Sequence, residues 1–134
     1  MEKYEQMFKL SIATAGAFIT WLVGGWDQSI YVLVLSMVFD YATGLMKAYK
    51  AKELSSNVGF NGITRKATML LVLMFAVALD RSMDTGWIFR TMVCWFYIGN
   101  EGLSFLENVA YLDVPIPAKL KDALIQLKDG NKNS

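Results

Sequence analysis

Residues 29–46 read SIYVLVLSMVFDYATGLM, an almost unbroken apolar run that contains a single acidic residue, Asp40. Its length is close to the ~20 residues that a helix needs to cross the hydrocarbon core of a bilayer. The preceding run, LSIATAGAFITWLVGGW at residues 10–26, has a similar length and no charged residue. The two runs therefore predict two consecutive membrane-spanning helices.

Two further apolar segments follow. The first of them, ATMLLVLMFAVAL at residues 67–79, would rise only ~20 Å as a helix, whereas the hydrocarbon layer is ~30 Å thick. Extension over residues 64–83 supplies the missing length, with Lys66 snorkelling at one end and Asp80 and Arg81 near the headgroups at the other. We predict an all-α integral membrane protein with four spans, at residues 10–26, 29–46, 64–83 (the short one) and 87–111.

The composition agrees with this class and narrows the function. Apolar residues make up 54% of the 134 residues and charged residues 19%, which is too apolar for an ordinary soluble domain of this size. There is no histidine and one cysteine, Cys94, so a His-based triad, a His-ligated metal site and an internal disulfide are excluded. Since the net charge is only +1, no nucleic-acid signature follows. Most familiar catalytic machinery is therefore missing from the sequence, and we expect no metal site and no nucleic-acid partner.

Basic residues predict the orientation, because Lys and Arg in short loops stay on the cytoplasmic side during insertion. Eleven of the 13 basic residues fall on one predicted side, and only Arg81 and Arg90 on the other, so both termini are predicted to be cytoplasmic. Trp26, Tyr31 and Trp87 then form an outer aromatic belt. The cytoplasmic basic residues are Lys3 and Lys9, the loop residues Lys47, Lys50, Lys52, Arg65 and Lys66, and the tail residues Lys119, Lys121, Lys128 and Lys132.

Residues 113–134 differ in character from the transmembrane domain at residues 1–112. After Pro115 and Pro117, the tail is predicted to form a short amphipathic helix and then a disordered end. Its apolar positions are Leu120, Leu124, Ile125 and Leu127. We expect this helix to lie on the inner leaflet, with its lysines reaching anionic headgroups.

Small residues recur every four positions in the first two spans, where they would allow helix backbones to approach closely. The alternative is that small residues are simply common in membrane helices. The helix-packing candidates are Gly16, Thr20 and Gly24 in the first span and Ser36, Gly44 and Ala48 in the second.

The fourth span contains the polar sequence FYIGNEGLSFLEN at residues 96–108. At ~1.5 Å per residue, Asp40 lies ~16 Å and Glu101 ~20 Å below the outer surface. No lysine or arginine is predicted at that depth. These acids must therefore be protonated, hydrogen-bonded to neighbouring polar groups or exposed to a water-filled cavity. We favour a face that packs inward in one assembly and lines water in another; the alternative is a neutral acid that only joins helices. The pore-lining candidates are Asp40, Asn100, Glu101, Ser104, Glu107 and Asn108.

Two blocks, FDYATGLMKAYKAKELSSNVGFNGITRKATM (residues 39–69) and IGNEGLSFLENVAYLDVPIPAKLKDAL (residues 98–124), resemble the phage-lysis and toxin-secretion holin family of phages and prophages of Gram-positive bacteria. One departure is Asp113, which stands where a glycine is more usual. The matching positions are Asp40, Gly44, Ser55, Ser56, Gly62, Arg65, Lys66, Glu101, Ser104, Glu107, Asn108, Pro115 and Pro117.

The resemblance implies a small, non-enzymatic protein that accumulates in the host cytoplasmic membrane, forms homo-oligomers and opens lesions at a set time. Through these lesions an endolysin, or a toxin in some relatives, leaves the cytoplasm. The implied partners are the lipid bilayer, further copies of the chain, an endolysin that need not touch it, and an antiholin. The resemblance carries no cofactor and no established residue-level site.

Two other classes of function stay open. A small proton-coupled multidrug-type transporter would also have four helices and a membrane glutamate, but residues 10–26 lack the first-helix acid that is usual there. A non-conducting scaffold subunit would use the basic loop and tail to hold a cytoplasmic partner. Drug resistance on expression would indicate the transporter, whereas harmless expression with a co-purifying partner would indicate the scaffold.

Overall fold

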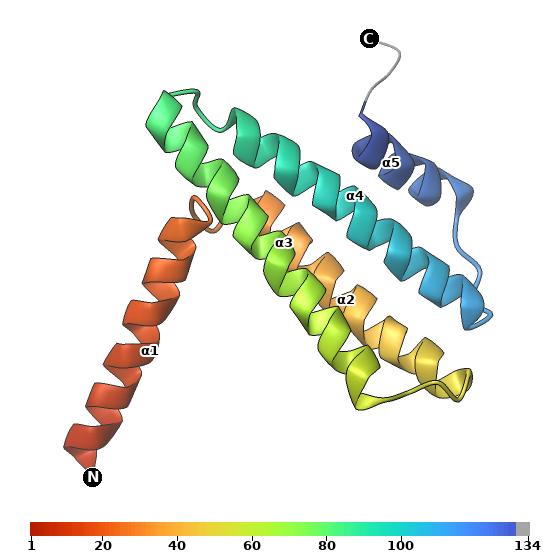
Figure 1. Cartoon of the computed structure of the whole chain (residues 1–134), viewed down its shortest axis with the longest axis horizontal. Coiled ribbons are helices and arrows are strands. Elements are labelled where there is room, and N and C mark those ends of the chain that lie inside the picture. The colour runs from red at the N-terminus through yellow and green to blue at the C-terminus, as the bar shows by residue number, and fades with distance from the viewer. Residues whose placement is uncertain (131–134) are drawn as a thin grey trace.

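The computed structural model describes residues 1–130, which form helices and no strand. Figure 1 shows α2, α3 and α4 side by side as one body, with α5 lying along α4 and α1 pointing away from the rest. The prediction of an all-α protein is confirmed. The helices are α1 (Glu2–Leu22), α2 (Gln28–Lys50), α3 (Ser56–Met83), α4 (Ile88–Tyr111) and α5 (Ala118–Asp129).

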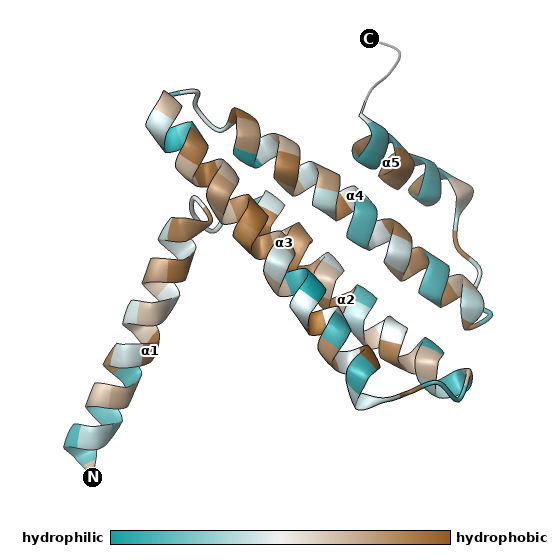
Figure 2. Ribbon diagram, viewed as in Figure 1, coloured by the Kyte–Doolittle hydropathy of each residue, from teal (hydrophilic) through white to brown (hydrophobic). Residues whose placement is uncertain are grey.

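Among the described residues, α2 and α3 are the helices whose length and composition suffice for crossing a membrane. Only 22% of the most apolar window of each helix is buried, although the core helix of a soluble protein is mostly buried. Large side chains such as Leu71 and Phe75 are more than half exposed. Figure 2 shows the apolar residues concentrated in the half of the body nearest α1. An apolar exterior of this extent fits contact with lipid.

Helix boundaries differ from the predicted spans where capping residues act. The α1 helix ends at Leu22 rather than at residue 26, because Gly24 and Gly25 adopt φ values of 85° and 106°, which favour glycine. The α3 helix begins at Ser56 rather than at residue 64, since the Ser55 hydroxyl accepts a hydrogen bond from the backbone N–H of Val58 at 3.2 Å.

The early start of α3 corrects the predicted basic loop. Lys47 and Lys50 lie in α2, and Arg65 and Lys66 lie in α3, so Lys52 alone of the five predicted loop cations lies in the connection. The α2–α3 connection is therefore much shorter than predicted, and two of its supposed cations lie deep along a helix.

The apolar core joins α2, α3 and α4 around Leu33, Leu73 and Ile98. Cys94 is fully buried there, with its sulfur 3.5 Å from the carbonyl oxygen of Ser29. Because lipid tails are as apolar as this core, burial alone does not hold membrane helices together. Polar contacts between the helices therefore carry more of the specificity.

The helix-packing candidates divide into two groups. Nothing lies within 4 Å of a Cβ placed on Gly16, and the Thr20 hydroxyl donates to the Gly16 carbonyl of its own helix. Gly24 lies after the end of α1, in the connection between α1 and α2. In α2, Ala48 is buried and Gly44 faces Asn108, whereas the Ser36 hydroxyl donates within its own helix. A packing role for the α1 residues between copies of the chain stays a prediction.

The tail forms the expected helix, α5, but one of its apolar residues turns toward α4. Leu124 is half-buried against α4, whereas Leu120, Ile125 and Leu127 are exposed. The predicted disordered end falls mainly on residues 131–134, which lie outside the described residues.

Candidate functional site

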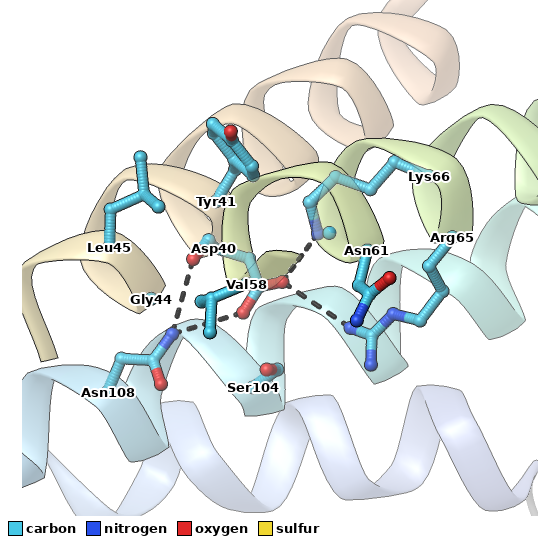
Figure 3. Close-up of a pocket in the computed structure, with 11 residues that line it drawn as sticks. Asp40, Tyr41, Gly44, Leu45, Val58, Asn61, Arg65, Lys66, Ser104 and Asn108 are labelled. Carbon is cyan, nitrogen blue, oxygen red and sulfur yellow. Dashed lines mark hydrogen bonds and ion pairs between the residues drawn. The ribbon is translucent and has the colours of Figure 1, made fainter. Parts of the chain in front are cut away.

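Four charged side chains from three helices meet inside the body. Lys66 of α3 contacts both carboxylates, at 2.5 Å from Asp40 of α2 and also against Glu101 of α4. The Arg65 guanidinium lies 3.3 Å from Glu101 and 3.6 Å from Asp40. Figure 3 shows Lys66 and Arg65 directed at Asp40 from the neighbouring helix. We call Asp40, Arg65, Lys66 and Glu101 the charge cluster.

Three of the four side chains of the charge cluster are largely buried, and its charges balance. The side chain of Glu101 is 0% exposed, that of Asp40 7% and that of Lys66 12%, whereas that of Arg65 is 58% exposed. Two carboxylates face two cations, so the ionised cluster is neutral. A buried ion pair that loses one partner leaves an uncompensated charge, at a cost of about 3–5 kcal/mol. The cluster therefore clamps α2, α3 and α4 together.

The expectation that no cation lies at the level of Asp40 and Glu101 is wrong. That expectation put Lys66 at the end of a span, near the headgroups. Because α3 begins at Ser56, Lys66 lies about 15 Å inside the helix. Ser55, a strong N-cap residue, was the sequence signal for the longer helix.

Asn108 of α4 joins Asp40 of the charge cluster to Thr43, one turn further along α2. Its side-chain amide donates to the carbonyl and the carboxylate of Asp40, both at 3.2 Å, and to the Thr43 hydroxyl at 3.1 Å. Beside these groups lies a cavity of about 280 Å³, whose lining includes the polar residues Tyr41, Ser104 and Asn108 (Figure 3). A water molecule takes up ~30 Å³ in the liquid, so the cavity has room for several waters next to Asp40.

The structure places the remaining pore-lining candidates beside a second polar cavity, of about 220 Å³. Asn100, Ser104 and Glu107 line it together with Arg65 and Lys128. Asn108 thus contacts Asp40 directly, and Lys66 joins Asp40 to Glu101. Ser104 borders both cavities, and Asn100 and exposed Glu107 lie farther out.

A second polar centre, at the opposite end of the body, was not singled out from the sequence. Buried Arg90 donates to the carbonyls of Val23 and Gly25, at 2.7 and 3.1 Å, and to the Asp27 carboxylate at 2.8 Å. This hydrogen bond from Arg90 holds the pKa of Asp27 well below its ordinary value. The Asp80 carboxylate accepts from the backbone N–H groups of Phe89 and Arg90, at 3.0 and 2.8 Å. The α1–α2 connection forms an elbow in the chain, and we call Arg90, Asp27 and the carbonyls of Val23 and Gly25 the elbow clasp.

Two helices that are long and apolar enough to cross a membrane, an apolar exterior and paired charges inside are typical of a small membrane protein. Comparison with known proteins identifies its kind: residues 17–129 match the model of the bacteriophage holin family. The chain belongs to this family, which is a non-enzymatic class of membrane protein.

Three individual relatives are similar over most of this chain, and one of them is named as a probable holin. The chain is 49% identical over 130 residues to an uncharacterized 14.9 kDa protein of the nagH 3′ region of Clostridium perfringens, covering 96% of this chain and 98% of the relative. It is 41% identical over 100 residues to a probable holin of Bacillus phage phi105, covering 75% of this chain and 73% of the phage protein. A Clostridium acetobutylicum protein is 35% identical over 124 residues, which cover 92% of this chain and 99% of that protein. No solved structure matches the chain.

Proposed function

We propose that this protein acts as a holin: it oligomerises in the bacterial cytoplasmic membrane and opens lesions that release an endolysin or a toxin. Family membership supports the general role. The observation that carries the mechanism is the charge cluster, in which Asp40 and Glu101 of two helices share Lys66 of a third. Such a cluster is neutral while the helices are packed and strongly hydrophilic once they separate.

The charge cluster supplies the two states that a timed lesion requires. In the packed subunit the buried charges satisfy one another, so the apolar exterior faces lipid. If α3 and α4 move apart, Glu101 and Lys66 lose their partners and need water instead. Because an isolated subunit cannot supply that water within lipid, the opening is favoured when several subunits place their clusters around one aqueous space. Ser104, Asn108 and the cavity beside Asp40 would line that space.

The proposed topology has four spans, α1 to α4, with both termini in the cytoplasm. Its support is the distribution of basic residues and the way the helix ends meet. The elbow clasp joins the α1–α2 connection to the start of α4, and Arg81 at the end of α3 donates to the Trp21 carbonyl at 2.6 Å. At the opposite end, Lys50 of α2 pairs with Asp113 after α4, at 2.9 Å. These contacts support the proposed up-and-down arrangement, in which successive helices cross in opposite directions.

Inducible expression in a bacterium tests the function. We expect a delay, then an abrupt release of a cytoplasmic reporter enzyme together with a small dye. Dye leakage without enzyme release would indicate small pores. Resistance to cationic drugs with an intact membrane would instead support the transporter, and harmless expression with a co-purifying protein would support the scaffold.

A further inference from the structure

The tail helix α5 lies antiparallel on α4 at two glycines (Figure 1). A Cβ at Gly99 would lie 2.7 Å from the backbone nitrogen of Lys128 and 2.9 Å from the carbonyl oxygen of Leu124. A Cβ at Gly102 would lie 2.9 Å from a methyl carbon of the Leu124 side chain. The two backbones therefore touch at Gly99, and any side chain there would force α5 away.

The place on α4 that α5 contacts, at Gly99 and Gly102, is next to the polar side of α4. We call this place the seat of α5. The cavity of about 220 Å³ lies between α5, represented by Lys128, and the residues Asn100, Ser104 and Glu107 of α4. These three are the residues that the fourth span could not expose to lipid. In the described subunit α5 therefore lies over part of the polar face of α4.

The contact of α5 with α4 is close, but it leaves most of α5 exposed. Leu124 is the only residue of α5 that is half-buried, and within residues 1–130 no ion pair joins α5 to the rest of the chain. The exposed Leu120, Ile125 and Leu127 give α5 a further apolar surface. Lys119 and Lys121 are close to these apolar residues in the chain. A helix that combines apolar residues with lysines can bind an anionic membrane surface. The helix thus has two alternative binding places, α4 and the inner leaflet.

We propose that α5 is an autoinhibitory cover: seated on Gly99 and Gly102 it shields the polar face of α4, and its transfer to the membrane surface frees that face for water. The inference rests on the proposed function, in which this face lines the lesion. The balance between the two places of α5 then sets how readily a subunit joins an open assembly.

Thiol labelling of the covered face tests the proposal. The reporter is Leu103→Cys, which borders the covered cavity, in a Cys94→Ala background that removes the native thiol. The full chain is reconstituted in vesicles of phosphatidylcholine and phosphatidylglycerol and treated with a charged maleimide. We expect Gly99→Ala to raise the labelling rate about 5-fold or more, the lower end of usual coupling effects. Gly16→Ala is the matched control, because Gly16 is also helical and has open space around it, and it should leave the rate unchanged.

A second pair of variants acts from the α5 side and leaves the α2–α4 body untouched. Leu124→Ser should raise the labelling rate as Gly99→Ala does, whereas Ile125→Ser, at a residue that is 39% exposed, should not. Equal labelling of the parent, Gly99→Ala and Leu124→Ser proteins would overturn the cover. The readout does not depend on lysis: faster labelling without enzyme release from cells would refute the holin role alone, and lysis with unchanged labelling would refute the cover alone.

Discussion

Lys66 is the residue on which the charge cluster depends, because it is the one cation that is both buried and shared by Asp40 and Glu101. Arg65 approaches the same carboxylates at longer distances and is itself more than half exposed. A carboxylate pair without Lys66 would repel across a buried space, and one member would be driven to bind a proton. The residue therefore decides whether three helices form one body.

Replacing Lys66 with Met should destabilise the folded protein by about 3–5 kcal/mol, the usual cost of breaking a buried ion pair. Denaturant titration in detergent micelles, followed by helical circular dichroism, measures this change. Lys9→Met is the control, since Lys9 is exposed on α1 and forms no ion pair within residues 1–130. A similar small effect of both substitutions would contradict a clamping role for Lys66.

Glu101 tests the link between the charge cluster and timing. We expect both Glu101→Gln and Glu101→Leu to advance lysis, the Leu variant more, because Gln keeps a hydrogen-bond acceptor for Lys66 and Leu does not. The measurement is the interval between induction and enzyme release, with the amount of membrane protein matched by immunoblot. Lysis on the normal schedule by both variants would show that the Glu101 carboxylate has no role in timing.

At the scale of the helices, the elbow clasp fixes how α1 leaves the body. Gly24 is needed there twice, for its φ of 85° and because a Cβ would lie 2.6 Å from Nε of Arg90. Gly25 also has a positive φ, of 106°, but nothing lies within 4 Å of its Cβ position. Substitutions at the two glycines therefore distinguish the cost of backbone strain, which both positions share, from the cost of the contact with Arg90, which arises only at Gly24.

Gly24→Ala should cost more stability than Gly25→Ala, by about 1–3 kcal/mol, since it adds overpacking to the same kind of backbone strain. Thermal unfolding of the two variants in the same detergent gives the difference. Equal losses would mean that the Arg90 contact adjusts at no cost and that the elbow clasp is not tightly packed.

The sequence predicted the helices themselves well, because long apolar runs leave little choice of structure. It predicted their ends less well: residues 56–63 are polar enough to resemble a loop, yet Ser55 starts α3 before them. The pairing of Lys66 with Asp40 and Glu101 was missed for that reason. The contact of α5 with α4 could not be predicted, since Gly99 and Gly102 indicate a close approach but not which helix makes it.

At the scale of the whole molecule, four spans with cytoplasmic termini can be tested by labelling single cysteines in the Cys94→Ala background. We expect Thr85→Cys, in the α3–α4 connection, to react with a membrane-impermeant maleimide added outside intact cells. Lys52→Cys, in the α2–α3 connection, should react only after permeabilisation. Outside labelling at both positions would show that α3 does not cross the membrane.

The attachment of α1 at one end alone has a geometrical consequence. A helix of 21 residues is about 32 Å long, so a difference of about 20° in the angle that the elbow clasp holds would place its free tip roughly 11 Å away, close to one helix diameter. A small difference in this angle would thus change which neighbouring helix α1 contacts. The area that each molecule occupies in a membrane therefore depends on the angle of α1 as well as on the size of the α2–α4 body.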